Sequence, residues 1–204
     1  PRIFTITECV TRSSEEQPTT IKLAEFPRPW KPGKNQRRVL AYCWGGNLQG
    51  SLGTGPTPPF SQVPVAVAGS HVFASLSSGG THGCGVKSDG AAFCWGGTES
   101  GQLGDGTTND SNVPVAVAGG LEFEAVSAGG GFTCGVTTTH LGYCWGGNGY
   151  GQLGTRNFDS ATSPAPVSGS HAFTRIDAGP ATTACAIDDV GAAWCWGQNG
   201  NGQL

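Results

Sequence analysis

The sequence contains no methionine, no apolar run of about 18 residues, and few charged side chains, which make up 12% of its 204 residues. Without a long apolar run, it predicts no membrane-spanning helix. A formal net charge of −3 does not supply the basic surface that neutralises phosphates, so nucleic-acid binding is not expected. Sparse charge together with 35 glycines also argues against a helical bundle.

Charge and glycine content divide the chain near residue 38. Residues 1–38 hold eight of the eleven basic residues but only one of the 35 glycines, Gly33. Prolines within residues 26–33 fix φ and remove backbone donors, so we expect an irregular segment outside the repeats that follow. A basic arm that docks on an acidic partner and a poorly ordered leader are the two interpretations. Because the chain begins with proline, we expect a piece of a longer protein.

Residues 39–204 form a tandem repeat. The tripeptide Cys-Trp-Gly recurs at spacings of 51, 50 and 51 residues, starting at Cys43, Cys94, Cys144 and Cys195. A phrase of the type Gly-Gln-Leu-Gly follows each copy, and Val-Pro-Val-Ala-Val-Ala-Gly occurs at both 63–69 and 113–119. The chain therefore contains one partial unit and then three full ones, at about 54–104, 105–154 and 155–204.

Each unit is predicted to form short β-strands, because apolar residues alternate in short runs bounded by Gly, Asn, Asp or Ser. A unit of about 50 residues with four strands has the size of one β-propeller blade. Since one blade cannot bury both faces of its sheet, blades must stack around an axis. The recurring Phe, Leu/Val/Ile and Trp positions are expected to fill the core between blades. A binding role for the tryptophans is the alternative.

The cysteines follow the same period. Three pairs are each ten residues apart, and folding the intervening residues as a hairpin with a three-residue loop places the two cysteines opposite each other. Facing residues in an antiparallel pair have Cα atoms about 4.5–5.5 Å apart, which is within disulfide range. The sequence therefore predicts three disulfides within blades: Cys84–Cys94, Cys134–Cys144 and Cys185–Cys195.

Two cysteines are left outside this pattern. Cys43 has no partner ten residues earlier, because Gly33 stands there, and Cys9 is the remaining one, so whether these two pair stays open. No Cys-x-x-Cys pair is present, so a structural zinc site is not expected, and free buried thiols are the alternative to disulfides. If the disulfides form, we expect an extracellular or cell-envelope location; a cytoplasmic one is the alternative.

The repeat phrases resemble the regulator of chromosome condensation repeat family. The resemblance rests on Phe-Glu-Ala-Val-Ser-Ala-Gly at 123–129, Thr-Cys-Gly-Val at 133–136, Tyr-Cys-Trp-Gly at 143–146 and Gly-Gln-Leu-Gly at 151–154. It covers residues 41–204 and implies an all-β propeller, of which this chain would be an arc or fragment of a seven-bladed ring. The open edges of an arc suggest self-association. The family's best-known member exchanges guanine nucleotide on a small GTPase, through an insertion and loop residues with no match here.

The sequence shows no catalytic, cofactor or metal motif. Residues 149–154 satisfy G-x-G-x-x-G, but a proline-containing strand phrase follows where a phosphate-binding helix would be needed. Asp105 begins a stretch with spaced oxygen ligands that hints at calcium, yet it lacks the glycine and the terminal acid of such loops. We therefore expect no enzyme activity and no cofactor.

Binding residues are expected where the repeats diverge. The units differ in the hairpin tips 87–91, 137–141 and 188–192, and in the loops 54–62, 105–112 and 155–162. Loops on a rigid scaffold commonly carry recognition, although loops also diverge where nothing constrains them. The candidate partner-binding residues are Phe60, Asp105, Asn109, Arg156, Phe158 and Asp159.

The function that follows from the sequence is a non-catalytic propeller that binds another protein through blade-edge loops. A guanine-nucleotide-exchange regulator of a small GTPase is the first alternative and would require a reducing compartment. A glycan-binding propeller is the second, and it would need exposed aromatic residues at equivalent positions of the loops.

Overall fold

The computed structural model describes residues 7–13, 39–56 and 59–204. This part of the chain consists of strands and two short 3-10 turns, η1 (Leu48–Gly50) and η2 (Ala68–Ser70). The strands of the first half are β1 (Thr7–Ser13), β2 (Val39–Gly46), β3 (Phe60–Ala66), β4 (Phe73–Ser78), β5 (His82–Lys87), β6 (Ala92–Gly96) and β7 (Ser111–Ala116). Those of the second half are β8 (Phe123–Ala128), β9 (Phe132–Thr137), β10 (Gly142–Gly146), β11 (Ala161–Pro166), β12 (Phe173–Ala178), β13 (Thr183–Asp188) and β14 (Ala193–Gly197).

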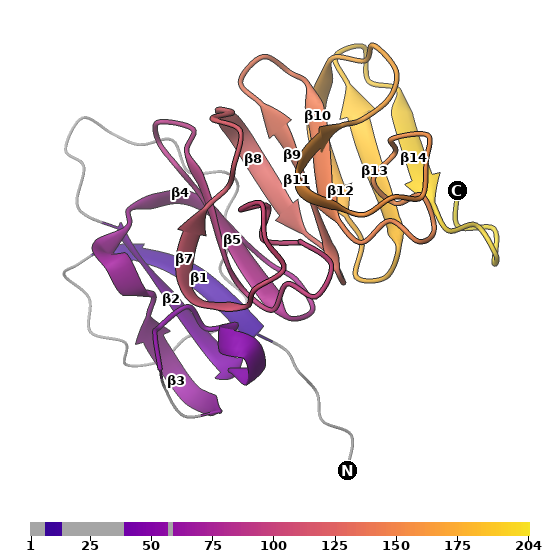
Figure 1. Cartoon of the computed structure of the whole chain (residues 1–204). Helices are drawn as coiled ribbons and strands as arrows, with labels where there is room; N and C mark the ends of the chain where they lie inside the picture. The colour runs from indigo at the N-terminus through magenta and orange to yellow at the C-terminus, as the bar shows by residue number, and fades with distance from the viewer. Residues whose placement is uncertain (1–6, 14–38, 57–58) are drawn as a thin grey trace.

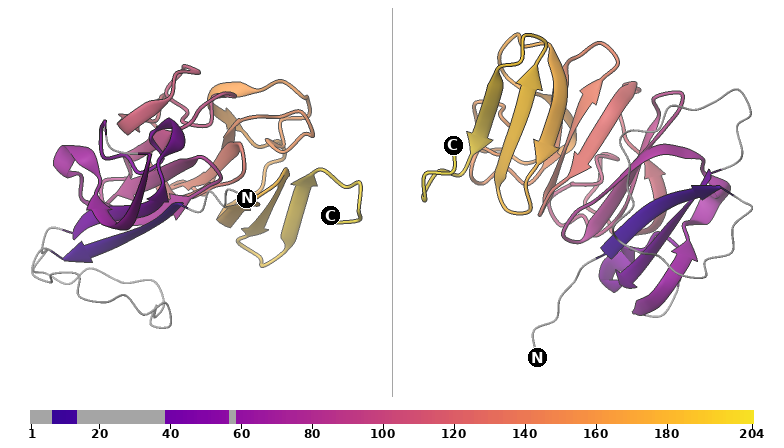
Figure 2. Two further views of the ribbon diagram at one scale, coloured as in Figure 1. Left: turned by 90° about the horizontal axis from the view of Figure 1, so that it is seen from below. Right: turned by 180° about the vertical axis from the view of Figure 1, so that it is seen from behind.

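The strands build four antiparallel sheets that follow one another along the chain (Figure 1). Two sheets have four strands, in the orders β4-β5-β6-β7 and β8-β9-β10-β11, and two have three strands, β1-β2-β3 and β12-β13-β14. Strands β4, β8 and β12 lie side by side at one edge of their sheets, and the sheets form an arc about that edge (Figure 2). The protein is therefore an all-β propeller fold with open ends, as the repeat predicts.

The sheets are offset from the sequence units. Strand β7 pairs with β6 although it lies in the next unit, and β11 pairs with β10 in the same way. A sheet such as 73–116 therefore crosses the boundary between units 54–104 and 105–154. The reason is that each proline phrase follows the loop after the Cys-Trp-Gly strand and folds back against that strand.

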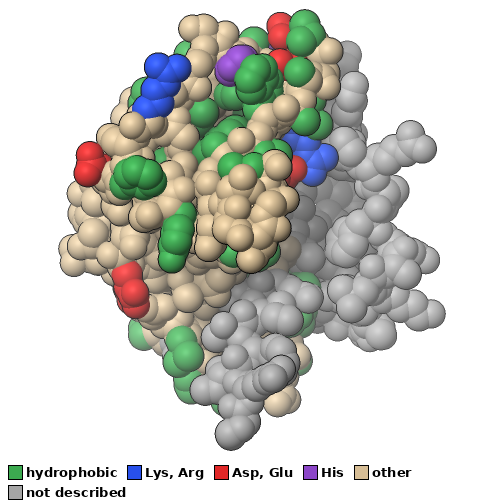
Figure 3. Space-filling view, turned by 90° about the vertical axis from the view of Figure 1, so that its right-hand side faces the viewer, with side chains coloured by type: hydrophobic (Ala, Val, Ile, Leu, Met, Phe, Trp, Pro, Cys, Tyr) green, Lys and Arg blue, Asp and Glu red, His purple; other side chains and the backbone are tan. Residues whose placement is uncertain are grey.

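On the side of the molecule where the C-terminal sheet lies, hydrophobic side chains reach the surface (Figure 3).

The structure corrects our expectation for residues 7–13, which we placed in an irregular segment. They form β1, which pairs with β2 so that Cys9 lies opposite Cys43, as Cys84 lies opposite Cys94 in β5 and β6. The two residues are joined by a disulfide across a sequence separation of 34. Our search for a partner ten residues earlier missed it, because β1 is not connected to β2 by a short hairpin. The rest of residues 1–38 lie outside the described part.

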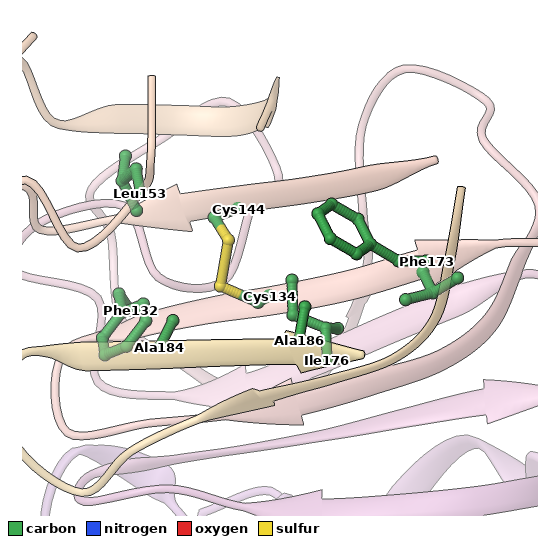
Figure 4. Packing of buried hydrophobic residues seen from close by; sticks show 9 residues of the cluster. Phe132, Cys134, Cys144, Leu153, Phe173, Ile176, Ala184 and Ala186 are labelled. Atoms are coloured by element: carbon green, nitrogen blue, oxygen red, sulfur yellow. A yellow bond between two sulfur atoms is a disulfide. The ribbon is translucent and has the colours of Figure 1, made fainter. Parts of the chain in front are cut away.

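The three hairpin disulfides are present, and Cys84–Cys94 and Cys134–Cys144 face the cores between neighbouring blades. The Cys134–Cys144 bridge is fully buried between its own sheet and the following one. Phe132 and Leu153 lie beside it, and Phe173 and Ile176 cover it from the next sheet (Figure 4). The chain-entropy model gives a loop of about ten residues up to ~3 kcal/mol of stabilisation.

The tryptophans hold neighbouring repeats together. Trp145 is fully buried, and its Nε1–H donates to the Gln102 carbonyl of the preceding unit at 3.0 Å. Its ring packs on Gly104, where an added Cβ would lie 2.6 Å from Nε1, so only glycine fits at this left-handed position. The same hydrogen bond recurs from Trp95 to Ser51 O at 3.1 Å and from Trp196 to Gln152 O at 2.9 Å. Trp95 and Trp145 are thus fully buried core residues, as expected, whereas Trp196 in the last sheet is partly buried.

A second set of contacts joins the inner strands. Ser77 Oγ accepts the N–H of Ala128 at 2.9 Å, and Ser127 Oγ accepts the N–H of Ala178 at 3.0 Å. The position that follows in this series is Asp177, whose carboxylate is exposed and pairs with Arg175 at 2.8 Å. Blade stacking is therefore specified by repeated polar contacts as well as by apolar burial.

Candidate interaction surface

The two divergent loop sets lie at opposite ends of the blades. Because consecutive strands are antiparallel, the hairpin tips lie where β5, β9 and β13 end, and the other loops lie where β2, β6 and β10 end. We call the second end the loop face; its described residues are 47–56, 59–62, 98–112 and 148–162. All six sequence-predicted binding residues belong to the loop face: Phe60, Asp105, Asn109, Arg156, Phe158 and Asp159.

The two predicted aromatic residues are strongly exposed. Phe60 is 58% exposed and Phe158 is 72% exposed. They lie in equivalent loops but at different positions. Ser61 faces Gly45 and Ala161 faces the equivalent Gly146, so Phe60 stands one residue before the shared position and Phe158 stands three residues before it. This arrangement does not repeat one aromatic platform from blade to blade, as a glycan-binding propeller would require.

Arg156 adds a positive charge beside Phe158. It is exposed and adopts φ 64, a left-handed conformation, whereas the equivalent positions are Gly55 and Gly106. A non-glycine residue held in this region costs stability, and such residues gather at binding sites. The fold therefore does not explain why arginine, and not glycine, stands at position 156.

The acidic and amide candidates mainly shape their loops. Asp105 Oδ1 accepts the backbone N–H and the hydroxyl of Thr107, both at 3.0 Å, and Thr107 Oγ1 accepts the N–H of Asn109 at 3.2 Å. The N–H of Asp159 donates to Asn157 at 3.3 Å. These are turns closed by side-chain oxygens. Asp105 is thus a turn former, while the exposed side chains of Asn109 and Asp159 face solvent.

Two exposed apolar residues of the loop face escaped the sequence reasoning. Leu48 is 53% exposed and Tyr150 is 55% exposed, and both lie just before the glycine-leucine phrases at 50–53 and 151–154. Aligning the units would have indicated that these two positions are exposed, because polar residues occupy them in the second unit: Glu99 aligns with Leu48, and Ser100 aligns with Tyr150. With Phe60 and Phe158, they give the loop face four large exposed hydrophobic side chains.

A buried amide fixes the shape of the third loop. Asn148 is fully buried; its Oδ1 accepts the N–H of Leu153 at 3.0 Å, and its Nδ2 donates to the carbonyls of Asn157 and Asp159, both at 3.0 Å. These bonds hold the backbone on both sides of Phe158. The exposed ring therefore stands on a rigid loop, which lowers the entropy lost on binding.

The opposite end of the last sheet carries a structural carboxylate. Asp188 Oδ2 accepts a hydrogen bond from Trp194 Nε1 at 2.9 Å, and Oδ1 accepts the N–H groups of Ala192 and Val190 at 2.7 and 3.2 Å. The Trp194 bond, together with the two backbone N–H groups, lowers the pKa of Asp188. This carboxylate closes the β13–β14 hairpin and is engaged on both oxygens.

A neutral histidine lies between the second and third sheets. His82 is fully buried, and its Nε2 lies 2.8 Å from Thr133 Oγ1, whose hydroxyl donates to Gln102 O at 2.8 Å. Nε2 must then carry the proton, and Nδ1 is a buried acceptor that finds no hydrogen-bond partner among the described residues. Burial lowers the pKa of His82 to about 4.

The described residues contain no group of three His, Cys, Asp or Glu side chains that could hold a metal ion. Within the same residues, no helix is long and apolar enough to cross a membrane.

Comparison with known families identifies the repeat. A model of the regulator of chromosome condensation (RCC1) repeat matches residues 89–136 and 143–186. A second RCC1 repeat model matches residues 73–102 and 123–152, so the matches together run from residue 73 to residue 186. The chain belongs to the RCC1 repeat family. No curated protein sequence matches the chain significantly.

Several solved structures share the fold. Human WBSCR16 superposes with a TM-score of 0.70 at 19% identity, over 78% of this chain and 44% of that one. Prp20p of Saccharomyces cerevisiae, studied with its binding to Gsp1p and histones, gives 0.68 at 20% identity, over 80% and 42%. The ectodomain of the Physcomitrella patens receptor kinase CR4 gives 0.50 at 26% identity, over 78% and 34%. The chain thus spans less than half the length of these proteins.

Proposed function

We propose that this RCC1-repeat chain is a non-catalytic protein-interaction module whose loop face binds another protein. The observation that carries the proposal is the exposed hydrophobic set on the rigid loop face, led by Phe158 at 72% exposure with Arg156 beside it. Aromatic residues and arginine dominate the binding energy of protein interfaces. Among the structural neighbours, Prp20p is described as binding Gsp1p and histones, which are protein partners.

The disulfides support a location outside the cytosol. All eight cysteines pair, in four bridges, and such bridges persist in oxidising environments. We therefore infer that the module is secreted or displayed at the cell surface. A guanine-nucleotide-exchange role is the alternative that the family suggests, and a small GTPase would have to meet the chain in such a compartment.

The test compares capture of extracellular proteins by the immobilised chain and by two variants. Phe158→Ala with Arg156→Gly removes both side chains and places at 156 the glycine found at Gly55 and Gly106. Leu141→Ala is the matched control, since Leu141 is 48% exposed at the opposite end of the blades. We expect the first variant to lose the captured protein and the control to retain it, with both keeping the thermal unfolding of the parent.

Two results would count against the proposal. Equal capture by the loop variant and the parent would remove Phe158 and Arg156 from the binding surface. Accelerated GDP release from a small GTPase on addition of the chain, measured with a fluorescent nucleotide, would instead favour the exchange-factor alternative.

A further inference from the structure

The second loop of the loop face carries an asparagine in a sequence pattern that the other units lack. Asn109-Asp110-Ser111 has the form Asn-x-Ser in which x is not proline, the acceptor pattern for N-linked glycans. It occurs once in the sequence, which has eight asparagines. The aligned tripeptides are Pro-Phe-Ser at 59–61 and Asp-Ser-Ala at 159–161, so the repeat itself does not demand asparagine at this position.

The loop that contains Asn109 is held at both of its ends by the neighbouring units. Gly106 N–H donates to Thr162 O, and Asn112 O accepts the N–H of Gly55, each at 2.8 Å. Residues 107–110, between these two points, are all exposed. Because the units on both sides belong to the described part of the chain, Asn109 is exposed with its neighbouring loops in place.

The backbone of this loop is fixed, whereas the Asn109 side chain is not engaged. Thr107 Oγ1 accepts the N–H of Asn109 at 3.2 Å, and Asp110 Oδ1 accepts the N–H of Thr98 at 2.8 Å. Among the described residues, no hydrogen bond involves the side-chain amide of Asn109, whereas the buried Asn148 uses both ends of its amide within its own loop. The Nδ2 of Asn109 can therefore carry a substituent in the folded protein without the loss of any contact.

Ser111 supplies the hydroxyl of the pattern, and in the folded chain that hydroxyl has another role. It donates to Val113 O at 2.7 Å, and Ser111 faces Gly96 at the start of β7. Ser61 makes the same bond to Val63 O at 2.7 Å, so this contact belongs to the repeat. Because the acceptor pattern requires the hydroxyl, transfer of a glycan has to take place before β7 pairs with β6.

The disulfides place the chain in a compartment where this modification occurs. The four bridges indicate an oxidising environment, and N-linked glycans are attached to secreted proteins on surface loops. The inference therefore rests on the extracellular location proposed above, but not on the binding role of Phe158 and Arg156.

We propose that Asn109 is an N-glycosylation site. The donor is an oligosaccharide carried on a polyprenyl diphosphate. Nδ2 of Asn109 forms a bond to C1 of the first sugar, the bond from C1 to the diphosphate oxygen breaks, and Nδ2 passes a proton to a base of the transferase. The bulky, polar glycan then covers the second loop, so a protein partner is expected to approach over the third loop, where Tyr150 and Phe158 are exposed.

The test begins with the chain isolated from the extracellular fraction of its own source. Its cysteines are alkylated without reduction, and the digested protein is treated with peptide-N-glycosidase in heavy-oxygen water. This enzyme converts a glycosylated asparagine into an aspartate that carries one heavy oxygen. We expect that mass shift at Asn109 and at no other asparagine, and the same spectra report whether the four bridges are closed.

Three variants secreted by eukaryotic cells test the pattern itself. Asn109→Asp and Ser111→Ala introduce the residues that the third unit carries as Asp159 and Ala161, so both are expected to fold. We expect both to be secreted without the glycan and to show no mass loss on treatment with the glycosidase. Ser111→Thr keeps the pattern and should lose the glycan mass as the parent does.

An unmodified Asn109 in native protein with all four bridges closed would overturn the proposal and leave the extracellular location standing. An unmodified Asn109 together with alkylated cysteines would overturn both. A glycan that persists in Asn109→Asp or Ser111→Ala would also overturn the assignment to this site. The heavy-oxygen label at Asn109, together with loss of the glycan in both of these variants and its retention in Ser111→Thr, supports the proposal.

Discussion

Replacing His82 by phenylalanine is expected to remove a large part of the acid sensitivity of this protein. The imidazole is fully buried, and burial lowers its pKa to about 4. The unfolded chain binds the proton near the ordinary value of about 6.5, so between these two values the unfolded state holds more protons. The free energy of unfolding must then fall as the pH falls from about 6.5 to about 4, and it levels off below that.

The magnitude follows from the difference between the two pKa values. At pH 5 the unfolded histidine is almost fully protonated and the folded one is mostly neutral, which costs ~2 kcal/mol relative to pH 7.5. Phenylalanine is a suitable replacement because Phe132 occupies the equivalent position in the next sheet. Thr133 still donates its hydroxyl to Gln102 in the variant, so no new buried donor is left without a partner.

The assay is urea unfolding of the oxidised protein at pH 7.5 and pH 5.0. We expect the parent to lose ~2 kcal/mol more than His82→Phe between these two values. His71, whose pKa is lowered by burial and by Lys87, is present in both proteins and cancels in the comparison. The control is His140→Asn, which removes a histidine from an exposed left-handed position that suits asparagine and leaves the buried contacts in place. Equal pH dependence in parent and His82→Phe would refute the reasoning.

Two substitutions in the core, one exposed control substitution and one labelling experiment give further tests. Trp145→Phe removes the hydrogen bond to Gln102 and part of a buried ring, so urea unfolding should show a loss of ~2 kcal/mol. Leu103→Ala empties a fully buried site and should cost ~2–5 kcal/mol in the same assay, whereas Leu48→Ala, at 53% exposure, should change stability by less than ~0.5 kcal/mol. Intact mass after thiol alkylation should show no labelled cysteine before reduction and eight afterwards, and any label before reduction would contradict the four bridges.

The sequence predicts the blades well because they are repetitive. The period of about 50 residues, the Cys-Trp-Gly strand and the ten-residue cysteine spacing each report a local hairpin, and the structure contains those hairpins. The offset of the sheets could not be predicted, since a tandem repeat has the same period whichever strand is taken as its start. Strand β1 was missed because it carries Cys9 but none of the other repeat phrases.

The candidate surface was predicted less completely for a physical reason. Divergence between units indicates which loops are free to change, but exposure depends on how neighbouring loops pack. Asp105 diverges from its counterparts and still acts in a turn, as its bonds to Thr107 show. Leu48 and Tyr150 lie just before the glycine-leucine phrases of their units, and only the packed loops reveal that these two side chains point outward.

The direction of the tryptophan contacts bears on how the chain folds as it is made. The indoles of Trp95, Trp145 and Trp196 each donate to a carbonyl that lies 43 or 44 residues earlier in the chain. During synthesis or export from the N-terminus, the acceptor for each of these three tryptophans therefore emerges before the tryptophan itself. A new blade can close its ten-residue cysteine loop locally and then dock on a finished neighbour. The array is thus suited to vectorial assembly, in which each blade serves as the template for the next.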